Sequence, residues 1–492
     1  MSGVAVIGLD LGTSSVKAVA FDSSGEALAA HAVEVGIASP TSERAEQDPD
    51  ELVGAAAEAT TAVVRDLAAE GRTVAGIGLS AAMHSLVALD HKGRPCTPLL
   101  LFADNRAAAQ ARQLAGQPGA VGLARRTGTP IHPMSPLVKL RWFAQCDPAT
   151  AERARRWVSA KEYLIRQLCE ADVVDHSIAS ATGLFNLEDM LWDEEALALA
   201  GITADLLSTP VPTTTMLYSQ GERLGLPAGT PVVIGASDGC SATLGAGATS
   251  AGTAALTVGT SGAIRKIVER PGSDPRARLF CYVLTQARWV VGGSISSGGI
   301  VLRWARDGLF PELARAAGRG AYARFDELAA AVPPGADGLV CLPYLLGERA
   351  PLWDPDLRGA FVGLSVRHGQ GHVLRALLEG VAFQLATVLE LVEGLGHPVA
   401  ALRADGGFTR SRLWLQIMAD VLGRPLELAR SVEGACRGAA LLTLEALGLA
   451  DAFALADATP IERIVQPDPA TAVTYRDGLE RFVKTRDQLL GR

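Results

Sequence analysis

The sequence predicts an α/β protein built from two domains, and three observations carry this prediction. Its 492 residues exceed what a single hydrophobic core usually supports. The motif Leu9-Asp-Leu-Gly-Thr-Ser-Ser15 returns about half a chain later as Leu256-Thr-Val-Gly-Thr-Ser-Gly262. Within residues 4–69, three short β-type runs precede a helical pattern, which is the order found in layered α/β proteins. We therefore expect domains at 1–246 and 247–492.

The first domain opens on three expected strands and a well-marked helix. Strands are expected at 4–10, 16–21 and 27–35. The helix at 48–69 has Asp48 or Asp50 as a candidate N-cap and a proline in its first turn. Further elements are expected as helices at 137–145, from Trp157 onward, at 372–391 and at 413–422, and as a buried strand at 232–234.

Composition excludes several classes of protein. Hydrophobic residues make up 48%, and the net charge of −8 argues against nucleic-acid or membrane-surface partners, which are themselves anionic. Asp10 interrupts the first apolar run, so we expect no signal peptide. No run approaches about 18 apolar residues, so we expect no membrane span. The seven cysteines are scattered without Cys-x-x-Cys spacing, which indicates reduced thiols and a cytoplasmic location.

The duplicated motif is the first candidate site. In each copy an apolar run ends in Gly-Thr-Ser and another run begins at once, as in a hairpin whose backbone N–H groups can bind an anion. An ordinary hairpin turn is the alternative for either copy alone. Two copies favour phosphate binding, and the residues expected to take part are Gly12, Thr13, Ser14 and Lys17 in the first copy and Gly259, Thr260 and Ser261 in the second.

A second candidate site follows the expected strand at 232–234. This strand ends in small residues and places Asp238 at the head of a helix. Asp238 is either the N-cap of that helix or a carboxylate held in a cleft as a general base. The run 76–81 also matches the relaxed dinucleotide fingerprint G-x-G-x-x-A, but no helical pattern opens there, so we reject that interpretation.

Polar residues at the ends of other strands are candidate substrate ligands, since α/β sheets present ligand contacts there. Each of them could instead be a structural hydrogen-bonding group. A Pro-rich loop at 127–136 is a candidate wall of the same site. The candidate substrate-binding residues are Met83, His84, Asp104, Arg106, Lys139 and Tyr163.

Together these stretches resemble the FGGY family of carbohydrate kinases over essentially the whole chain. The resemblance rests on the order of the two Gly-Thr-Ser turns, Asp238, Gly359-Ala-Phe-Val-Gly-Leu364 and Asp405-Gly-Gly407. Among the members of that family, the chain most resembles the gluconate kinases. The resemblance implies two actin-like domains of the ribonuclease H type, with an active-site cleft between them.

The resemblance also implies roles for these residues. ATP would lie on the two turns, with Gly406, Gly407 and Phe408 beside its adenine. Asp10 and Asp238 would hold Mg²⁺, and Asp238 would accept the proton of the attacking hydroxyl. Members of the family are often dimers, so a homodimer fits the resemblance.

The acceptor is expected to be gluconate, whose carboxylate needs a cationic partner. Arg106, with help from His84 or Lys139, is expected to bind it, while Asp104 takes hydroxyl groups. Lys161 adds a further cation to this region. We keep open the alternative that Arg106 only pairs with a neighbouring carboxylate and braces the loop. Alternatives for the whole protein are a xylulose or other pentulose or polyol kinase, a sugar sensor without turnover, and an actin-like ATPase switch.

Overall fold

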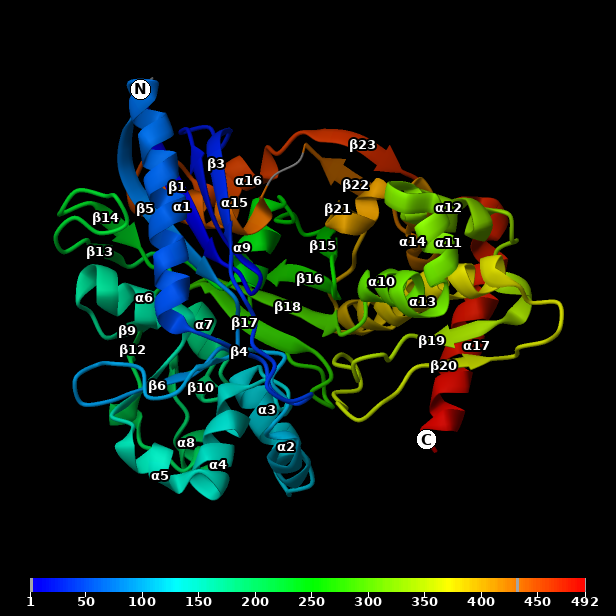
Figure 1. Ribbon diagram of the computed structural model, residues 1–492, viewed down its shortest axis with the longest axis horizontal. Helices are drawn as coiled ribbons and strands as arrows, with labels where there is room; N and C mark the ends of the chain where they lie inside the picture. Colours follow the sequence, from blue (N-terminus) through cyan, green and yellow to red (C-terminus); the bar gives the residue numbers. More distant parts are fainter. Residues whose placement is uncertain (1–2, 431–432, 492) are drawn as a thin grey trace. The chain divides into compact units, whose positions relative to one another are not determined.

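The computed structural model describes residues 3–430 and 433–491 (Figure 1). The chain splits into two compact units. Unit 1 contains Met1–Ser250, Ile267–Val291 and Ser431–Thr459, and unit 2 contains Ala251–Lys266, Gly292–Arg430 and Pro460–Arg492. The predicted domain boundary between residues 246 and 247 differs from this division, because Ile267–Val291 and Ser431–Thr459 also belong to unit 1. That boundary stays a prediction about the two halves of the sequence.

Unit 1 contains both strands and helices. Its strands are β1 (Val4–Leu11), β2 (Ser15–Phe21), β3 (Ala27–Glu34), β4 (Glu46–Gln47), β5 (Thr73–Ala81), β6 (Val87–Leu89), β7 (Leu99–Leu100), β8 (Arg156–Val158), β9 (Val173–Asp175), β10 (Phe185–Asn186), β11 (Leu191–Trp192), β12 (Thr209–Val211), β13 (Met216–Tyr218), β14 (Pro231–Val233) and β17 (Phe280–Thr285). Its helices are α1 (Pro49–Ala69), α2 (Ala108–Ala115), α3 (Ala120–Thr127), α4 (Pro136–Cys146), α5 (Pro148–Arg153), α6 (Ala160–Cys169), α7 (His176–Ser180), α8 (Glu194–Ala200), α9 (Asp238–Gly245), α15 (Gly434–Ala446) and α16 (Ala452–Asp457).

The central sheet of unit 1 has the strand order β13-β14-β5-β1-β2-β3. β1 pairs antiparallel with β2 and parallel with β5, so the three predicted N-terminal strands are confirmed. The run 76–81 lies inside β5, which confirms that it is a strand and not a dinucleotide loop. The expected helix from Trp157 is wrong at its start, because Trp157 lies in β8 and α6 begins at Ala160 behind a capping box from Ser159.

Two helices from distant parts of the sequence cover this sheet (Figure 1). α1 contacts β2 and β3, and it begins where the Asp48 side chain accepts a hydrogen bond from Asp50 N, as predicted for an N-cap. α15 contacts β1 and β5. A Cβ atom on Gly8 or Gly78 would collide with α15, so these glycines allow the helix to lie directly on the strands.

Unit 2 repeats the plan of a sheet with helices. Its strands are β15 (Thr253–Val258), β16 (Gly262–Val268), β18 (Arg288–Ile295), β19 (Val340–Leu342), β20 (Ala360–Val362), β21 (Ala401–Asp405), β22 (Leu426–Ala429) and β23 (Ile461–Val465), with the unit boundary falling inside β16 and β18. Its helices are α10 (Ile300–Trp304), α11 (Pro311–Ala317), α12 (Ala321–Ala330), α13 (Gln370–Gly394), α14 (Arg412–Leu422) and α17 (Ala472–Leu489), with a π-helical turn at Ala305–Leu309.

The sheet of unit 2 places β15 between β16 and β21, followed by β22 and β23. β15 is antiparallel to β16 and parallel to β21, which repeats the pairing of β1 with β2 and β5. The helices α13 and α14 pack against each other, and α14 ends at Gly423 in the left-handed conformation, as the sequence predicts.

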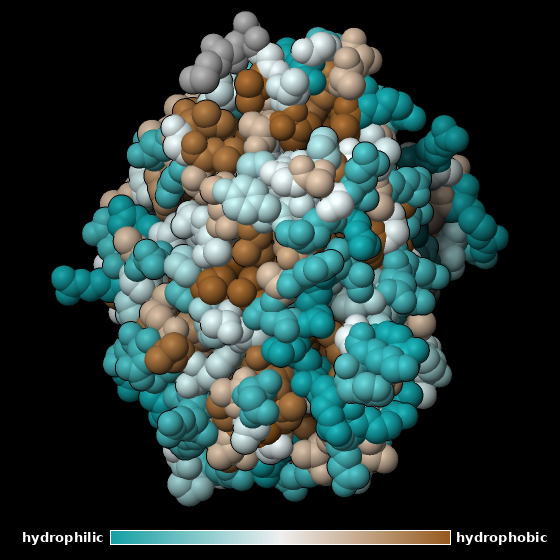
Figure 2. Space-filling view, turned by 90° about the vertical axis from the view of Figure 1, so that its left-hand side faces the viewer, coloured by the Kyte–Doolittle hydropathy of each residue, from teal (hydrophilic) through white to brown (hydrophobic). Residues whose placement is uncertain are grey.

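The surface mixes polar and apolar side chains. On the face seen in Figure 2, hydrophobic residues lie in separate patches divided by hydrophilic ones. Within residues 3–430 and 433–491, no helix combines the length and the hydropathy that a membrane span requires. The seven cysteines are all free thiols, which confirms that no disulfide frame is present.

Candidate active site

The first Gly-Thr-Ser turn closes the hairpin of β1 and β2, which confirms the hairpin expected from the sequence. The last paired residues are Leu11 and Val16, so Gly12, Thr13 and Ser14 form the turn itself. The side chain of Gln47 donates a hydrogen bond to the carbonyl oxygen of Thr13, at 2.8 Å. This bond fixes the turn from β4, which pairs with β7 in a separate two-stranded sheet.

Asp10 lies near the end of β1, beside the turn. Its Oδ1 accepts a hydrogen bond of 2.8 Å from the Ser80 hydroxyl on β5, the residue that faces it across the parallel pair. Burial, and after it the negative charge of Asp238, raise the pKa of Asp10 to about 6. The two carboxylates are therefore close enough for their charges to interact.

These two carboxylates fit a magnesium ion. Mg²⁺ uses one or two protein carboxylates and completes its shell with water and substrate phosphates. Among residues 3–430 and 433–491, no cluster of three or more His, Cys, Asp or Glu side chains could hold a metal by itself. The unfavourable charge pair of Asp10 and Asp238 is the kind of site that a divalent cation stabilises.

Asp238 is the first residue of α9, and the N-cap position belongs to Ser237. The alternative that Asp238 is itself the N-cap is therefore wrong. Its Oδ1 accepts a hydrogen bond from the N–H of Gly239, at 2.7 Å, and the side chain is only partly buried. A general-base role for this carboxylate stays a prediction.

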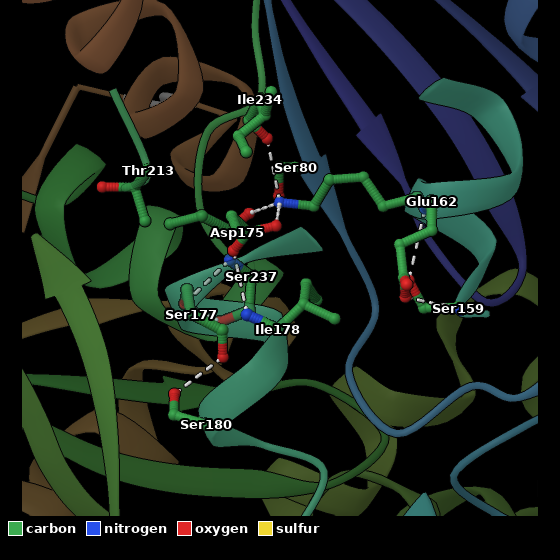
Figure 3. A network of polar contacts seen from close by, with 12 residues as sticks. Ser80, Ser159, Glu162, Asp175, Ser177, Ile178, Ser180, Thr213, Ile234 and Ser237 are labelled. Carbon is green, nitrogen blue, oxygen red and sulfur yellow. Dashed lines mark hydrogen bonds and ion pairs between the residues drawn. The ribbon is translucent and has the colours of Figure 1, made fainter. Parts of the chain in front are cut away.

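A buried network of polar contacts, drawn in Figure 3, holds the backbone at Ile234 and Ser237, just before Asp238 in the sequence. Lys161 forms an ion pair of 2.7 Å with Asp175 and donates to the carbonyl oxygens of Ile234 and Ala236. The hydroxyl of Ser177, on α7, accepts from the N–H of Ser237, the residue before Asp238. The backbone on the N-terminal side of Asp238 is thus fixed from α6 and α7.

In this network Lys161, expected from the sequence as a further cation of the substrate region, has a buried protein partner instead. Its side chain is 1% exposed, and so is that of its partner Asp175. Burial lowers the pKa of Lys161, and the negative charge of Asp175 opposes that effect. Lys161 therefore supports the Asp238 turn and presents no charge to a substrate.

Arg106 also has protein partners. Its guanidinium donates to Asp104, at 2.8 Å, and to Glu46, and its side chain is 8% exposed. Asp104 is fully buried and accepts in addition from the N–H of Ala45. This arrangement matches the bracing alternative, and it speaks against Arg106 as a clamp for the substrate carboxylate and against Asp104 as a ligand for hydroxyl groups.

Arg106→Ala is expected to destabilise the fold and to impair all acceptors equally. Removing one partner of a buried ion pair leaves the other charge uncompensated, which costs about 3–5 kcal/mol. Urea unfolding and kcat/KM with gluconate and xylulose measure both effects. Arg126→Ala is the control, because Arg126 also pairs with two carboxylates but is more exposed. A loss confined to gluconate would restore the clamp hypothesis.

Lys139 acts on the backbone of the His84 turn. Its Nζ donates to the carbonyl oxygens of His84 and Leu101, at 2.6 and 2.7 Å, and the side chain is fully buried. Burial lowers the pKa of Lys139 to about 7, although the charge of Asp104 opposes the shift. These bonds fix the backbone of His84, and a substrate contact of Lys139 stays a prediction.

His84 has an uncommon backbone conformation, with a φ of 67°. Non-glycine residues rarely adopt this region, and they are found there mostly in turns and functional sites. Its Nδ1 lies 2.8 Å from the carbonyl oxygen of Ala181. A carbonyl can only accept, so Nδ1 carries a proton, and Nε2 is the acceptor in the neutral ring.

The other predicted residues of unit 1 have varied surroundings. Met83 packs beside a core cluster that includes Phe185. Tyr163 donates a hydrogen bond to Asp50 and lines a cavity of about 750 Å³ to which neither His84 nor Asp238 contributes. The substrate contact of Tyr163 stays a prediction.

Lys17 follows the first turn and faces Asp10 across the hairpin. It forms an ion pair of 2.8 Å with Glu433, and both side chains are partly exposed. Burial lowers its pKa, but the hydrogen bond to Glu433 and the negative charges of Glu433, Cys436 and Asp10 together outweigh burial, so the pKa is raised. Its contact with a phosphate stays a prediction.

Unit 2 contains a cavity of about 590 Å³ beside the second turn. Gly259 and Thr260 lie at its edge, together with Gly407 and Phe408 from the segment after β21. Ser261 and Gly406 do not line it, but Gly406 has a φ of 107° and a Cβ there would collide with Val258. Four of the predicted nucleotide residues therefore meet in one cavity, and its volume suits a nucleotide-sized ligand.

Sequence reasoning missed several residues that line this cavity. The missed side chains are Leu302, Arg303, Tyr322, Asp326, Arg410, Ser411 and Trp414. Asp326 is half-buried, and burial raises its pKa while a hydrogen bond from Ser411 lowers it. It lies on α12, whose sequence carries no motif. The Ser411 N-cap of α14 was the signal available, because an N-cap marks a helix start after a glycine pair.

The duplicated strands carry a reversed pair of side chains. In unit 1 the carboxylate of Asp10 on β1 faces the hydroxyl of Ser80 on β5. In unit 2 the hydroxyl residue, Thr257, is on β15 and the carboxylate, Asp405, is on β21. The two hairpins are therefore structural repeats with different chemistry, and only the first places a carboxylate on the hairpin strand.

Comparison with known proteins agrees with this arrangement. Residues 5–245 match the N-terminal domain of the FGGY family of carbohydrate kinases, and residues 249–447 match its C-terminal domain. A gluconokinase of Bacillus licheniformis is 41% identical over 97% of this chain and 94% of its own length. A xylulose kinase of Staphylococcus epidermidis is 29% identical over 90% of this chain and 88% of its own.

Among solved structures, a gluconate kinase from Lactobacillus acidophilus superimposes with a TM-score of 0.91 at 32% identity, covering 99% of this chain and 98% of its own. The repeated hairpins, the two carboxylates of unit 1 and the cavity of unit 2 thus occur in a chain whose two halves both match one family. The chain belongs to the FGGY family of carbohydrate kinases.

Proposed function

We propose that the protein is a gluconate kinase, which transfers the γ-phosphate of ATP to the primary hydroxyl of gluconate and forms 6-phosphogluconate. The observation that carries the proposal is the 41% identity to a gluconokinase over nearly the full chain, against 29% to a xylulose kinase. The carboxylates of Asp10 and Asp238 beside a phosphate-binding type of turn support a phosphoryl transfer.

Phosphoryl transfer depends mainly on positioning and on charge stabilisation. We infer that the backbone N–H groups of the turns at 12–14 and 259–261 bind phosphate oxygens, and that the cavity at Phe408 holds the adenosine. A bound Mg²⁺ would neutralise charge on the phosphates, with Asp10 and Asp238 as the residues that hold it. Asp238 would accept the proton of the attacking hydroxyl.

The recognition of the acceptor rests on fewer residues than the sequence suggested. Arg106, Asp104, Lys139 and Lys161 have buried protein partners. His84 and Met83 remain the proposed sugar contacts. Because Lys139 fixes the backbone of His84, and Ala181 fixes its ring, the imidazole is held in one orientation before the substrate binds.

The proposal extends to the setting of the enzyme. ATP and Mg²⁺ are its expected cofactors, and a small sugar acid is its expected substrate. A homodimer and a cytoplasmic location are the corresponding proposals for assembly and location. Neither nucleic acid nor a membrane is an expected partner, given the net charge of −8.

A coupled assay of ADP release tests the proposed substrate. With Mg-ATP, gluconate is expected to give a higher kcat/KM than xylulose, ribulose, glycerol and glucose, because the chain is 41% identical to a gluconokinase and 29% identical to a xylulose kinase. A preference for xylulose or ribulose would make the protein a pentulose kinase. ADP release that does not depend on any sugar would indicate an ATPase switch, and no release with any sugar would indicate a sensor.

A further inference from the structure

The turn after β18 lies against the second Gly-Thr-Ser turn. Gly298 N donates to the carbonyl oxygen of Thr260, at 3.0 Å, and Gly299 N donates to that of Gly259, at 2.6 Å. A Cβ atom on Gly298 would collide with the carbonyl group of Ser261. The two turns therefore share backbone hydrogen bonds, and a displacement of one displaces the other.

A buried glutamate holds the other side of this connecting turn. Glu348 Oε1 accepts hydrogen bonds from the N–H groups of Ser296, at 2.6 Å, and Arg349, at 2.8 Å. The guanidinium of Arg349 donates to the carbonyl oxygen of Ile295, at 2.7 Å, and Ala350 N donates to that of Ser294, at 2.9 Å. Residues 348–350 thus bind three consecutive residues that lead into the turn.

Glu348 is an unusual residue for a protein interior, because it buries a carboxylate whose hydrogen-bonding capacity is only half used. Its side chain is 0% exposed, and Oε2 has no hydrogen-bond partner in the part of the chain that the structure describes. Burial raises its pKa to about 7, although the two N–H groups and the charge of Arg349 act in the opposite direction. A buried, half-satisfied carboxylate destabilises a fold, so its contribution lies in the backbone groups that it fixes.

We propose that Glu348 is a positioning residue for the second phosphate turn, acting on Gly259 and Thr260 through the turn at 296–299. The proposal rests on the nucleotide-binding role given above to the cavity of unit 2. Loss of the carboxylate frees the N–H of Ser296, the connecting turn shifts, and the N–H groups of 259–261 lose the orientation that a phosphate requires.

Two substitutions test the position of the turn by direct ADP binding. Glu348→Gln keeps one acceptor oxygen but loses the charge, so calorimetry with Mg-ADP is expected to show about five-fold weaker binding. Glu348→Ala removes the acceptor and is expected to weaken binding at least about thirty-fold. The KM for ATP should rise in the same order, while the KM for gluconate stays within about two-fold. Backbone amides of 259–262 should exchange hydrogen faster.

A second buried glutamate of unit 2 provides the matched control. Glu379 is 2% exposed and accepts from the N–H of Gly335, from Arg375 and from the Tyr475 hydroxyl, and none of these partners belongs to either turn. Glu379→Gln is expected to lower Tm and to leave the Mg-ADP dissociation constant within about two-fold. Should Glu348→Ala fail to fold, Glu348→Gln decides the question.

Wild-type Mg-ADP affinity in Glu348→Gln, or equal changes in the KM of ATP and gluconate, would overturn the positioning role. Tighter ADP binding in Glu348→Gln would also overturn it, because charge repulsion would then outweigh positioning. These outcomes are independent of the acceptor. If wild-type protein binds Mg-ADP but does not phosphorylate gluconate, the proposed function fails and the role of Glu348 is still tested.

Discussion

Replacing Asp238 with asparagine is expected to lower kcat at least about 10²-fold and to leave the binding of ATP and gluconate nearly unchanged. Asparagine keeps the shape of the side chain and its hydrogen bond from Gly239, but it cannot accept a proton. Steady-state assays of ADP release give kcat, and calorimetry gives the two dissociation constants.

The control for Asp238→Asn is a variant that removes a negative charge at the start of another helix. Glu194 lies in the first turn of α8 and is exposed, so Glu194→Gln removes a charge that interacts with the helix dipole. That variant is expected to keep wild-type kcat. Near-normal turnover in Asp238→Asn would reassign Asp238 to the metal site alone, and a parallel loss of substrate binding would indicate a general disturbance of α9.

Asp10→Asn is expected to slow turnover, to raise the magnesium requirement and to stabilise the metal-free protein. The pKa of Asp10 is about 6 in the fold, above its ordinary value of 3.8. The folded state therefore favours the protonated form, and the ionised carboxylate destabilises it increasingly as the pH rises from about 4 to about 6. Asparagine removes this effect, so the gain should be on the order of 1–3 kcal/mol above pH 6 and vanish below pH 4.

Urea unfolding of wild type and Asp10→Asn in EDTA at several pH values measures this gain. Asp22→Asn is the control of opposite sign, because hydrogen bonds from Ser24 and Glu26 outweigh burial and lower the pKa of Asp22. That variant should be less stable than wild type at neutral pH. A stability gain that does not change with pH, or an unchanged magnesium dependence, would assign Asp10 a structural role only.

The local signals in the sequence predicted much of the fold. The Gly-Thr-Ser turns and the N-cap of α1 each depend on neighbours within a few residues. Such features follow from backbone preferences and short-range hydrogen bonds, so they can be recognised in an isolated stretch. The start of α6 was predicted wrongly because Trp157 belongs to β8, a strand that pairs with β6, about 70 residues earlier in the chain.

The candidate site was predicted less well where charge partners were distant in sequence. Arg106 pairs with Glu46, and Lys161 pairs with Asp175, which neither spacing nor composition could indicate. A basic side chain near a strand end has the same appearance in sequence whether it binds a substrate or a buried carboxylate. The predicted lining of the cavity in unit 2 was also incomplete, because Asp326 lies on a helix whose sequence carries no motif.

The close contacts of Gly8 and Gly78 with α15 determine when unit 1 can finish folding during synthesis of the chain. α15 and α16 belong to unit 1 but leave the ribosome only after nearly all of unit 2 has been made. Until then the strand faces at Gly8 and Gly78 have no covering helix. Part of the sheet in the nascent first half therefore stays exposed until α15 has been made. A fragment ending near residue 246 lacks this helix and is a poor candidate for separate expression. Unit 1 can be completed only when synthesis of the chain is nearly finished.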